Sequence, residues 1–152
     1  MEGASERGFT LLEMVCVLAI VALMAAVLLP SLPRATSRAR LEAYALEIAT
    51  LLKGDRNAAI RRGGSVATAV DAARRRIAAG ASGAAVEVAD DVAVEAVLPL
   101  NCEGRAALSS IRFFADGSSC GGTIALERFR SRFEIQVNWL TGRIEIVSRA
   151  IN

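Results

Sequence analysis

The hydrophobic pattern of the chain changes twice, and each change predicts a different kind of element. From Phe9 to Leu29 the chain is almost continuously apolar, with Glu13 as its only charged residue. As a helix, these 21 residues (29 − 9 + 1) would span roughly 31 Å, about the thickness of a hydrocarbon core. The sequence therefore predicts a transmembrane helix over residues 9–30.

Beyond Pro30 the chain keeps a helical period but gains a polar face. Pro30 and Pro33 are expected to bend the helix, and Gly63-Gly64 to end it. Between positions 41 and 59 apolar residues recur at steps of three and four, and charged residues fall mostly elsewhere. The apolar positions are Leu41, Tyr44, Ala45, Ile48, Leu51, Leu52, Ala58 and Ala59, and the charged ones are Glu42, Glu47, Lys53, Asp55 and Arg56. We predict one helix from about Thr10 to Arg62, amphipathic over residues 31–63.

After Gly64 the period of the pattern falls from 3.6 to 2, which is typical of strands. The alternation predicts strands at 66–71, 86–88, 92–97, 111–114, 123–129, 133–139 and 143–147, with a further one starting at 74–77. Asp116-Gly117 and Leu140-Thr141-Gly142 read as hairpin turns. Trp139 is expected to be a core or rim aromatic. The fold class is therefore α+β, with one long helix packed on an antiparallel β-sheet domain at residues 64–152.

Composition excludes several classes of function. The chain has no histidine, which removes the commonest metal ligand and the usual base of serine and cysteine nucleophiles. We therefore expect no enzyme, no cofactor and no metal site, and read Asp90-Asp91 as a turn. The net charge is +2, and the triplet Arg74–Arg76 lacks interleaved aromatics, so nucleic acid is not an expected partner.

The chain has three cysteines, Cys16, Cys102 and Cys120. Cys16 lies inside the apolar run and reads as a small hydrophobic residue. If the later domain lies outside the cytoplasm, a disulfide between Cys102 and Cys120 is the economical interpretation. The sequence leaves open whether the two thiols are joined.

The junction before the apolar run carries a more specific signal. Arg7-Gly8-Phe9-Thr10-Leu11-Leu12-Glu13 resembles the class III leader of the type IV pilin and type II secretion pseudopilin superfamily. The resemblance implies a leader at residues 1–8, cleavage between Gly8 and Phe9 by a prepilin peptidase, and N-methylation of Phe9. It also implies a pilin-like fold and places Pro30 at the position of the family's helix-bending proline.

The resemblance further gives Glu13 a role in assembly. A carboxylate in hydrocarbon is costly unless a cation meets it. Cleavage creates such a cation, the amino group of Phe9, and the family resemblance implies that Glu13 pairs with this group on a neighbouring subunit of a filament. The alternative is an interfacial carboxylate that reaches water.

Looser motifs in the later domain resemble the H-type minor pseudopilins. They lie at residues 56–63, 113–119, 121–122 and 137–143, and Cys120 departs from the pattern. The resemblance implies a structural subunit near the tip of the type II secretion pseudopilus, for export of folded periplasmic proteins. Its implied location is the bacterial inner membrane, as a single-pass protein with its C-terminal domain in the periplasm. The implied partners are the I-J-K minor pseudopilins, the major pseudopilin, the prepilin peptidase and the inner-membrane secretion platform.

The main alternative is a minor type IV pilin that acts in pilus priming or DNA uptake. A DNA receptor on such a pilus would need a basic face. Removal of the leader leaves 17 basic and 14 acidic residues, a net charge of +3 (17 − 14), which is modest for that role.

Overall fold

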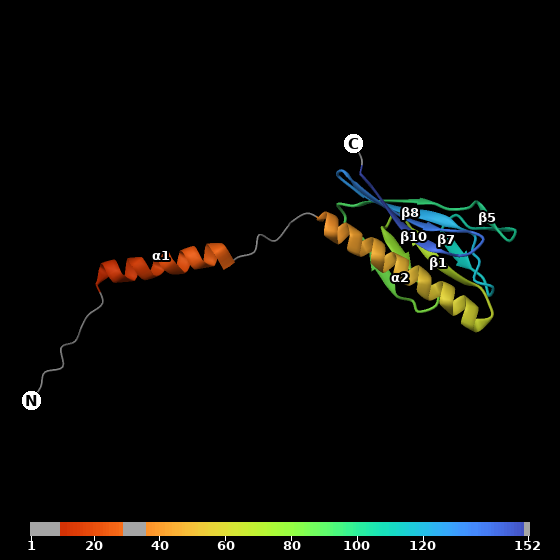
Figure 1. The fold of residues 1–152 in the computed structure, drawn as a ribbon, viewed down its shortest axis with the longest axis horizontal. Helices are drawn as coiled ribbons and strands as arrows, with labels where there is room; N and C mark the ends of the chain where they lie inside the picture. Colours follow the sequence, from red (N-terminus) through yellow and green to blue (C-terminus); the bar gives the residue numbers. More distant parts are fainter. Residues whose placement is uncertain (1–9, 29–35, 151–152) are drawn as a thin grey trace, which may run out of the picture. The chain divides into compact units, whose positions relative to one another are not determined.

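A computed structural model describes residues 10–28 and 36–150. Its contacts divide into two units with the boundary at residue 34, and each unit is described by itself. The first unit contains helix α1, Leu11–Leu28. The second contains helix α2, Arg38–Arg62, which lies along a β-sheet domain (Figure 1).

The single helix expected from Thr10 to Arg62 is instead two helices in the described residues. Ser37 has extended backbone (φ −75°, ψ 163°) and caps α2, because its side chain accepts a hydrogen bond from the Arg40 amide at 3.3 Å. Asp91 also accepts hydrogen bonds from the Thr36 amide (2.9 Å) and hydroxyl (2.7 Å). These local bonds hold the chain out of the helical conformation just before α2. Pro30 and Pro33 lie outside the described residues.

The far end of α2 is as expected. Gly63 adopts a left-handed conformation (φ 62°), where an L side chain would be strained, and it closes the helix as its cap. The predicted apolar face is also confirmed, with Tyr44 and Leu51 partly buried at its edge. The fully buried members are Leu41, Ala45, Ile48, Ala49, Leu52, Ala58 and Ala59. Asp55 is the exception, because the pattern assigned it to the polar side and the structure buries it to 1% exposure.

The first sheet has the strand order β3-β2-β1-β7 and is antiparallel throughout. Its strands are β1 (Val66–Asp71), β2 (Arg76–Ala78), β3 (Ala85–Glu87) and β7 (Ser110–Phe113). All four were expected near these positions. The pairing of β1 with β7, in which Val66 lies opposite Phe113, joins segments more than forty positions apart and was not foreseen.

The second sheet has the order β10-β9-β8-β4 and is also antiparallel. Its strands are β4 (Ala93–Val97), β8 (Gly122–Arg128), β9 (Ser131–Val137) and β10 (Ile144–Ala150). A short hairpin of β5 (Asn101–Cys102) and β6 (Arg105–Ala106) stands apart, and the sequence pattern did not predict it. The strand expected at 133–139 ends two residues early.

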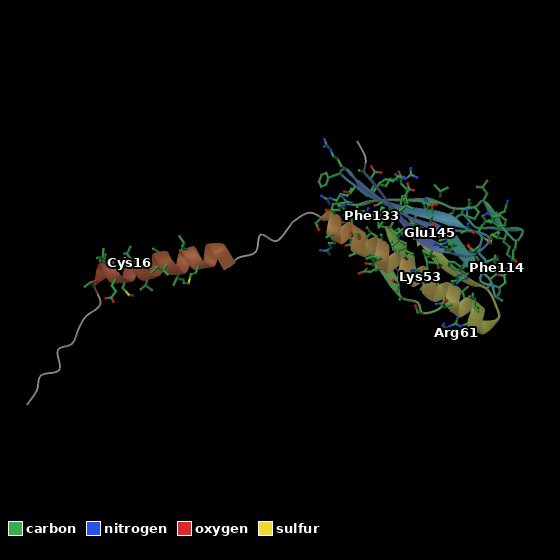
Figure 2. All side chains as sticks on the ribbon, in the orientation of Figure 1. Cys16, Lys53, Arg61, Phe114, Phe133 and Glu145 are labelled. Carbon is green, nitrogen blue, oxygen red and sulfur yellow. A yellow bond between two sulfur atoms is a disulfide. The ribbon has the colours of Figure 1, made fainter. Side chains whose placement is uncertain are left out.

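One hydrophobic core lies between α2 and both sheets. Ile77 and Phe113 come from the first sheet, and Ile124, Leu126 and Ile135 from the second, each fully buried. Phe133, which is labelled in Figure 2, belongs to β9 together with Ile135 and is 4% exposed. The alternation of buried and partly buried residues along β9 agrees with the predicted period of two.

Candidate functional site

The N-terminal candidate site begins with Thr10, since Gly8 and Phe9 lie outside the described residues. Thr10 caps α1: its carbonyl accepts hydrogen bonds from the amides of Glu13 (3.1 Å) and Met14 (3.2 Å), and its hydroxyl accepts one from Glu13 (3.2 Å). The spacing Thr-x-x-Glu is that of a capping box, a signal that sequence analysis could have used here. The carboxylate of Glu13 therefore stands in the first turn, where the helix dipole favours a negative charge.

The rest of α1 presents an apolar surface on all sides. The large hydrophobic side chains described in this helix are each more than half exposed, from 51% for Val17 to 82% for Leu11. Figure 2 shows them, with Cys16 among them, projecting around the helix. Cys16 is a free thiol. In the part of the chain that the structure describes, no helix combines the length and hydropathy required to cross a membrane.

A second candidate site lies at the C-terminal end of α2, where three of the segments that suggested the H-type resemblance meet. Arg56 donates from Nε to the carbonyl of Gly117 (2.9 Å) and from Nη2 to the carbonyl of Thr141 (3.1 Å). One arginine thus joins residues 56–63 to the turns at 113–119 and 137–143. These segments are 61 and 85 positions from Arg56, and only the fold brings them together.

Glycines make this close approach possible. Gly117 (φ 83°) and Gly142 (φ 60°) both adopt left-handed backbone conformations. A Cβ atom on Gly142 would collide with the carbonyl of Gly117 and lie 2.8 Å from Nε of Arg56. Asn138 shapes the same turn, since its side-chain oxygen accepts hydrogen bonds from the amides of Leu140 and Thr141, each at 3.0 Å. The two turns are therefore held in one fixed arrangement.

Trp139 lies on this turn and is 66% exposed. Of the two positions predicted for Trp139, the core is wrong, because β9 ends at Val137 and Trp139 lies in the turn that follows. Its exposure agrees with a position at the rim of the domain. Trp139 borders a cleft of about 760 Å³ together with Val97 and Pro99 on one side and Arg143 and Glu145 on the other. An exposed indole beside an apolar edge and a charged rim has the composition of a protein-contact surface.

The structure joins Cys102 to Cys120 in a disulfide, with Cα atoms 5.7 Å apart. The bond ties the β5–β6 hairpin to the segment before Gly121 and Gly122. Gly121 lies against Trp139, since a Cβ atom on Gly121 would come within 3.1 Å of the Trp139 Cβ. The disulfide therefore pins the Ser/Gly segment that forms one wall of the cleft.

Asp55 connects α2 to the first sheet. Its carboxylate accepts hydrogen bonds from the Thr68 hydroxyl (2.6 Å) and from the amides of Gly80 (2.9 Å) and Ala81 (2.9 Å). Three donors compensate the burial of this charge. Gly80 is required next to it, because a Cβ there would collide with the carbonyl of Ala67. Periodicity could not reveal the burial of Asp55, since its partners come from strand β1 and from the segment after β2, outside the helix.

The basic residues 74–76 and the acidic residues 90–91 all form ion pairs with other residues of the domain. Arg74 pairs with Asp71 at 3.0 Å, Arg75 pairs with Asp90, and Arg76 lies 3.6 Å from Glu87. Asp91 pairs with Arg128. Within the described residues no three acidic or cysteine side chains are grouped to hold a metal ion. The triplet is therefore a set of ion pairs along the first sheet.

A second charge network covers the outer face of the second sheet. Arg132 lies 2.8 Å from Glu127, 3.0 Å from Glu134 and 3.1 Å from Glu95. Its hydrogen bond holds the pKa of Glu134 below the ordinary value, and bonds to Glu127 and Glu134 raise the pKa of Arg132. In two turns, hydrogen bonds from Arg74 lower the pKa of Asp71, and those from Ser118 lower the pKa of Asp116.

Comparison with known proteins first defines the class. Residues 3–29 match the prokaryotic N-terminal methylation motif. The structure is similar to the minor pseudopilin EpsH of the type 2 secretion system of Vibrio cholerae (TM-score 0.55, 10% identity, 70% of this chain and 95% of that chain). It is equally similar to the type IV minor pilin FimU of Pseudomonas aeruginosa (TM-score 0.55, 18% identity, 74% of this chain and 91% of that chain). The chain has the pilin-like fold expected from the sequence.

Sequence identity then gives the family. The chain is 33% identical over 143 residues to the type II secretion system protein H of Xanthomonas campestris pv. campestris, an alignment that covers 91% of this chain and 81% of that protein. The chain therefore belongs to the type II secretion system protein H family. The resemblance inferred from the leader and from the three loop motifs is confirmed.

Proposed function

We propose that this chain is a structural minor subunit of the type II secretion pseudopilus, located near its tip, where it links the tip complex to the shaft of major pseudopilin. The observation that carries this proposal is the 33% identity with protein H over 91% of the chain. Fold similarity alone does not distinguish the two filament systems, because EpsH and FimU give the same TM-score. Within this role the subunit performs no chemistry and contributes packing surface.

The N-terminal segment serves as both anchor and assembly element in this proposal. The prepilin peptidase cuts between Gly8 and Phe9, Phe9 is N-methylated, and residues 9–30 hold the subunit in the inner membrane with residues 64–152 in the periplasm. The match to the methylation motif over residues 3–29 supports this order of events, as does the unpartnered apolar surface of α1. The secretion platform in the inner membrane then receives the processed subunit.

Glu13 supplies the specific contact during assembly. Its position in the first turn of α1 places a carboxylate beside a long run of apolar side chains. Inside a filament the N-terminal amino group of a neighbouring subunit is a cation that can meet this carboxylate, and pairing offsets the cost of holding either charge unpaired in apolar surroundings. The pairing therefore drives the subunit from the bilayer into the filament.

The test of this role is Glu13→Ala in a strain that assembles pseudopili, with Glu42→Ala as the matched control on the exposed side of α2. We expect Glu13→Ala to be inserted and cleaved normally but to be absent from sheared pseudopili. The control should be incorporated at the wild-type level. Recovery of Glu13→Ala in pseudopili at that same level would refute the pairing.

Mass spectrometry of the mature protein tests the processing steps. We expect a chain of 144 residues (152 − 8) with one methyl group on Phe9 and two hydrogens fewer than the reduced form, for the bond between Cys102 and Cys120. An intact leader would contradict the proposed cleavage.

The second candidate function is that of a minor type IV pilin, since the chain shares its fold with FimU as well as with EpsH. Deletion of the gene separates the two. Loss of secreted folded proteins with normal surface pili indicates the type II system, whereas loss of pili with normal secretion indicates the pilus. The neighbourhood of secretin and pseudopilin genes, or of pilus retraction genes, provides the same distinction.

A further inference from the structure

The turn between β8 and β9 presents an aromatic side chain in a strained backbone conformation. Phe129 has a φ of +51°, the left-handed region that glycine and asparagine adopt most easily, and its side chain is 79% exposed. The sequence pattern had placed Phe129 as the last residue of a strand. A large apolar residue that is both strained and 79% exposed contributes little to the packing of the domain, which points to a contact outside it.

The ring of Phe129 packs against the side chain of Arg128. The guanidinium carbon of Arg128 lies 4.3 Å from the ring centroid, and the Arg128 side chain is only 10% exposed. Arg128 pairs with Asp91 and donates to the Asp91 carbonyl at 3.2 Å. Asp91 in turn accepts the two hydrogen bonds from Thr36. These contacts connect the Phe129 turn to Thr36, just before the first residue of α2.

Unpaired basic side chains surround the turn. A shallow hollow of about 460 Å³ separates it from the first turn of α2, and Arg38 and Arg130 are both on its lining. Both of these arginines are exposed, and neither forms an ion pair within the described residues. The Arg128–Asp91 pair adds no net charge. The end of the domain is thus aromatic and basic.

This end is also where the apolar segment joins the domain. Eight peptide units separate Leu28 from Thr36, and a chain of that length spans at most about 30 Å. If α1 is anchored in a bilayer, the chain cannot carry Thr36 far from the membrane surface. In the second unit, the β8–β9 turn lies at the same end as the start of α2 (Figure 1).

We propose that the Phe129 turn, with Arg38 and Arg130, docks the globular domain on the surface of an anionic lipid bilayer before assembly. Phe129 enters the boundary between headgroups and acyl chains, and the guanidinium groups bind lipid phosphates. A lipid surface fits better than the apolar helix of a second subunit, because such a helix offers a single carboxylate, Glu13, which the proposed assembly already pairs with an amino group. The inference rests on the proposed anchoring of the chain by residues 9–30.

The contact orients the subunit without holding it permanently. Surface charges are screened by salt, and a single aromatic side chain provides little apolar area. The domain therefore leaves the bilayer readily when the subunit joins a filament, and Phe129 becomes free for a subunit contact. Trp139 and the turn that Arg56 binds lie at the opposite end of β9 from Phe129. Docking through Phe129 therefore directs them away from the lipid.

The test uses the full processed chain in vesicles of phosphatidylethanolamine and phosphatidylglycerol that contain brominated lipids, which quench indole fluorescence by contact. The native protein has one tryptophan, Trp139, which serves as the internal control. In the double variant Phe129→Trp, Trp139→Phe the only indole is in the turn. We expect strong quenching in this variant and none in the native protein.

A pair of charge variants in the double-variant background tests the basic contribution. Arg130→Glu should lower the docked population by about fivefold or more, and pure phosphatidylcholine vesicles should do the same. Arg105→Glu, an equal charge change at an exposed position on β6, should have no effect.

Flotation of the same vesicles at alkaline pH separates the two proposals. An inserted chain whose turn is not quenched would overturn the docking and leave the anchor intact. A chain that fails to float would overturn the anchor and the docking with it. Quenching that persists after Arg130→Glu would overturn the role of anionic lipid, and burial of the new indole in detergent at rising protein concentration would point to a second subunit instead.

Discussion

The two helices of this chain follow one another in the sequence and have opposite relations to their surroundings. In α2 one face is covered by both sheets, and Leu41, Ala45, Ile48 and Leu52 are at most 1% exposed. In α1 side chains of the same kind are exposed by half or more. An amphipathic helix finds its partner within its own chain, whereas a helix that is apolar all round requires one from outside. The contrast separates the helix that packs in the core of the domain from the helix to which we assign anchoring and assembly in the proposed function.

The largest effect should come from shortening a buried side chain of α2. Leu52→Ala removes a fully buried residue and should lower the free energy of unfolding by about 2–5 kcal/mol. Leu18→Ala, the same change in α1 at a side chain 67% exposed, should leave the stability of the domain unchanged. Urea denaturation of the processed chain in detergent, followed by circular dichroism, measures both. Equal losses would contradict the division between the helices.

The cysteines offer a second comparison. Replacing Cys102 and Cys120 by serine removes a cross-link with a sequence separation of 18 and should cost about 3 kcal/mol in the chain-entropy account. Cys16→Ser in α1 should cost nothing in the domain. The same denaturation series, run without reductant, distinguishes them. A double variant as stable as the native chain would show that the bond is not formed.

Asp55 should matter more than an exposed acid on the same helix. Asp55→Ala leaves the Thr68 hydroxyl and the Gly80 and Ala81 amides without their acceptor, and we expect a loss of about 2–3 kcal/mol. Glu47→Ala removes an exposed carboxylate from the same helix and should change the free energy of unfolding by less than about 0.5 kcal/mol. Amide hydrogen exchange at Gly80 and Ala81 should accelerate in the first variant only.

The smallest expected effect is on the stability of the domain at acidic pH, through Glu134. The pKa of Glu134 is lowered in the folded protein, first by Arg132 and then by Gln136, so its ionised form favours folding. This contribution is complete above the unfolded pKa of about 4.5 and is lost as the pH falls through the lower folded value. Arg132→Gln should reduce the stability by less than about 1 kcal/mol at neutral pH and flatten the decline below pH 4.5. Unfolding of the native chain and of this variant, measured from pH 3 to 7, tests the prediction.

Much of the fold follows from periodicity. The apolar face of α2 and the strands of the two larger sheets were predictable because burial repeats with the period of each element, and the end of α2 was predictable from Gly63. The break before α2 was not, since it depends on Asp91, which reaches Thr36 from 55 positions away. The predicted strand was extended two residues too far, to Trp139, because an alternating pattern does not show where a strand ends.

The processing motif and Glu13 could be recognised from the sequence because they lie in consecutive residues near the N-terminus, and the family follows from 33% identity over 91% of the chain. The tertiary structure alone decided that β1 pairs with β7 and that Asp55 is buried. It also decided that Arg56 joins two distant turns and that Phe129 stands exposed beside the start of α2. The reason is physical: local periods record which side of an element is apolar, while contacts between elements depend on how their faces are packed together.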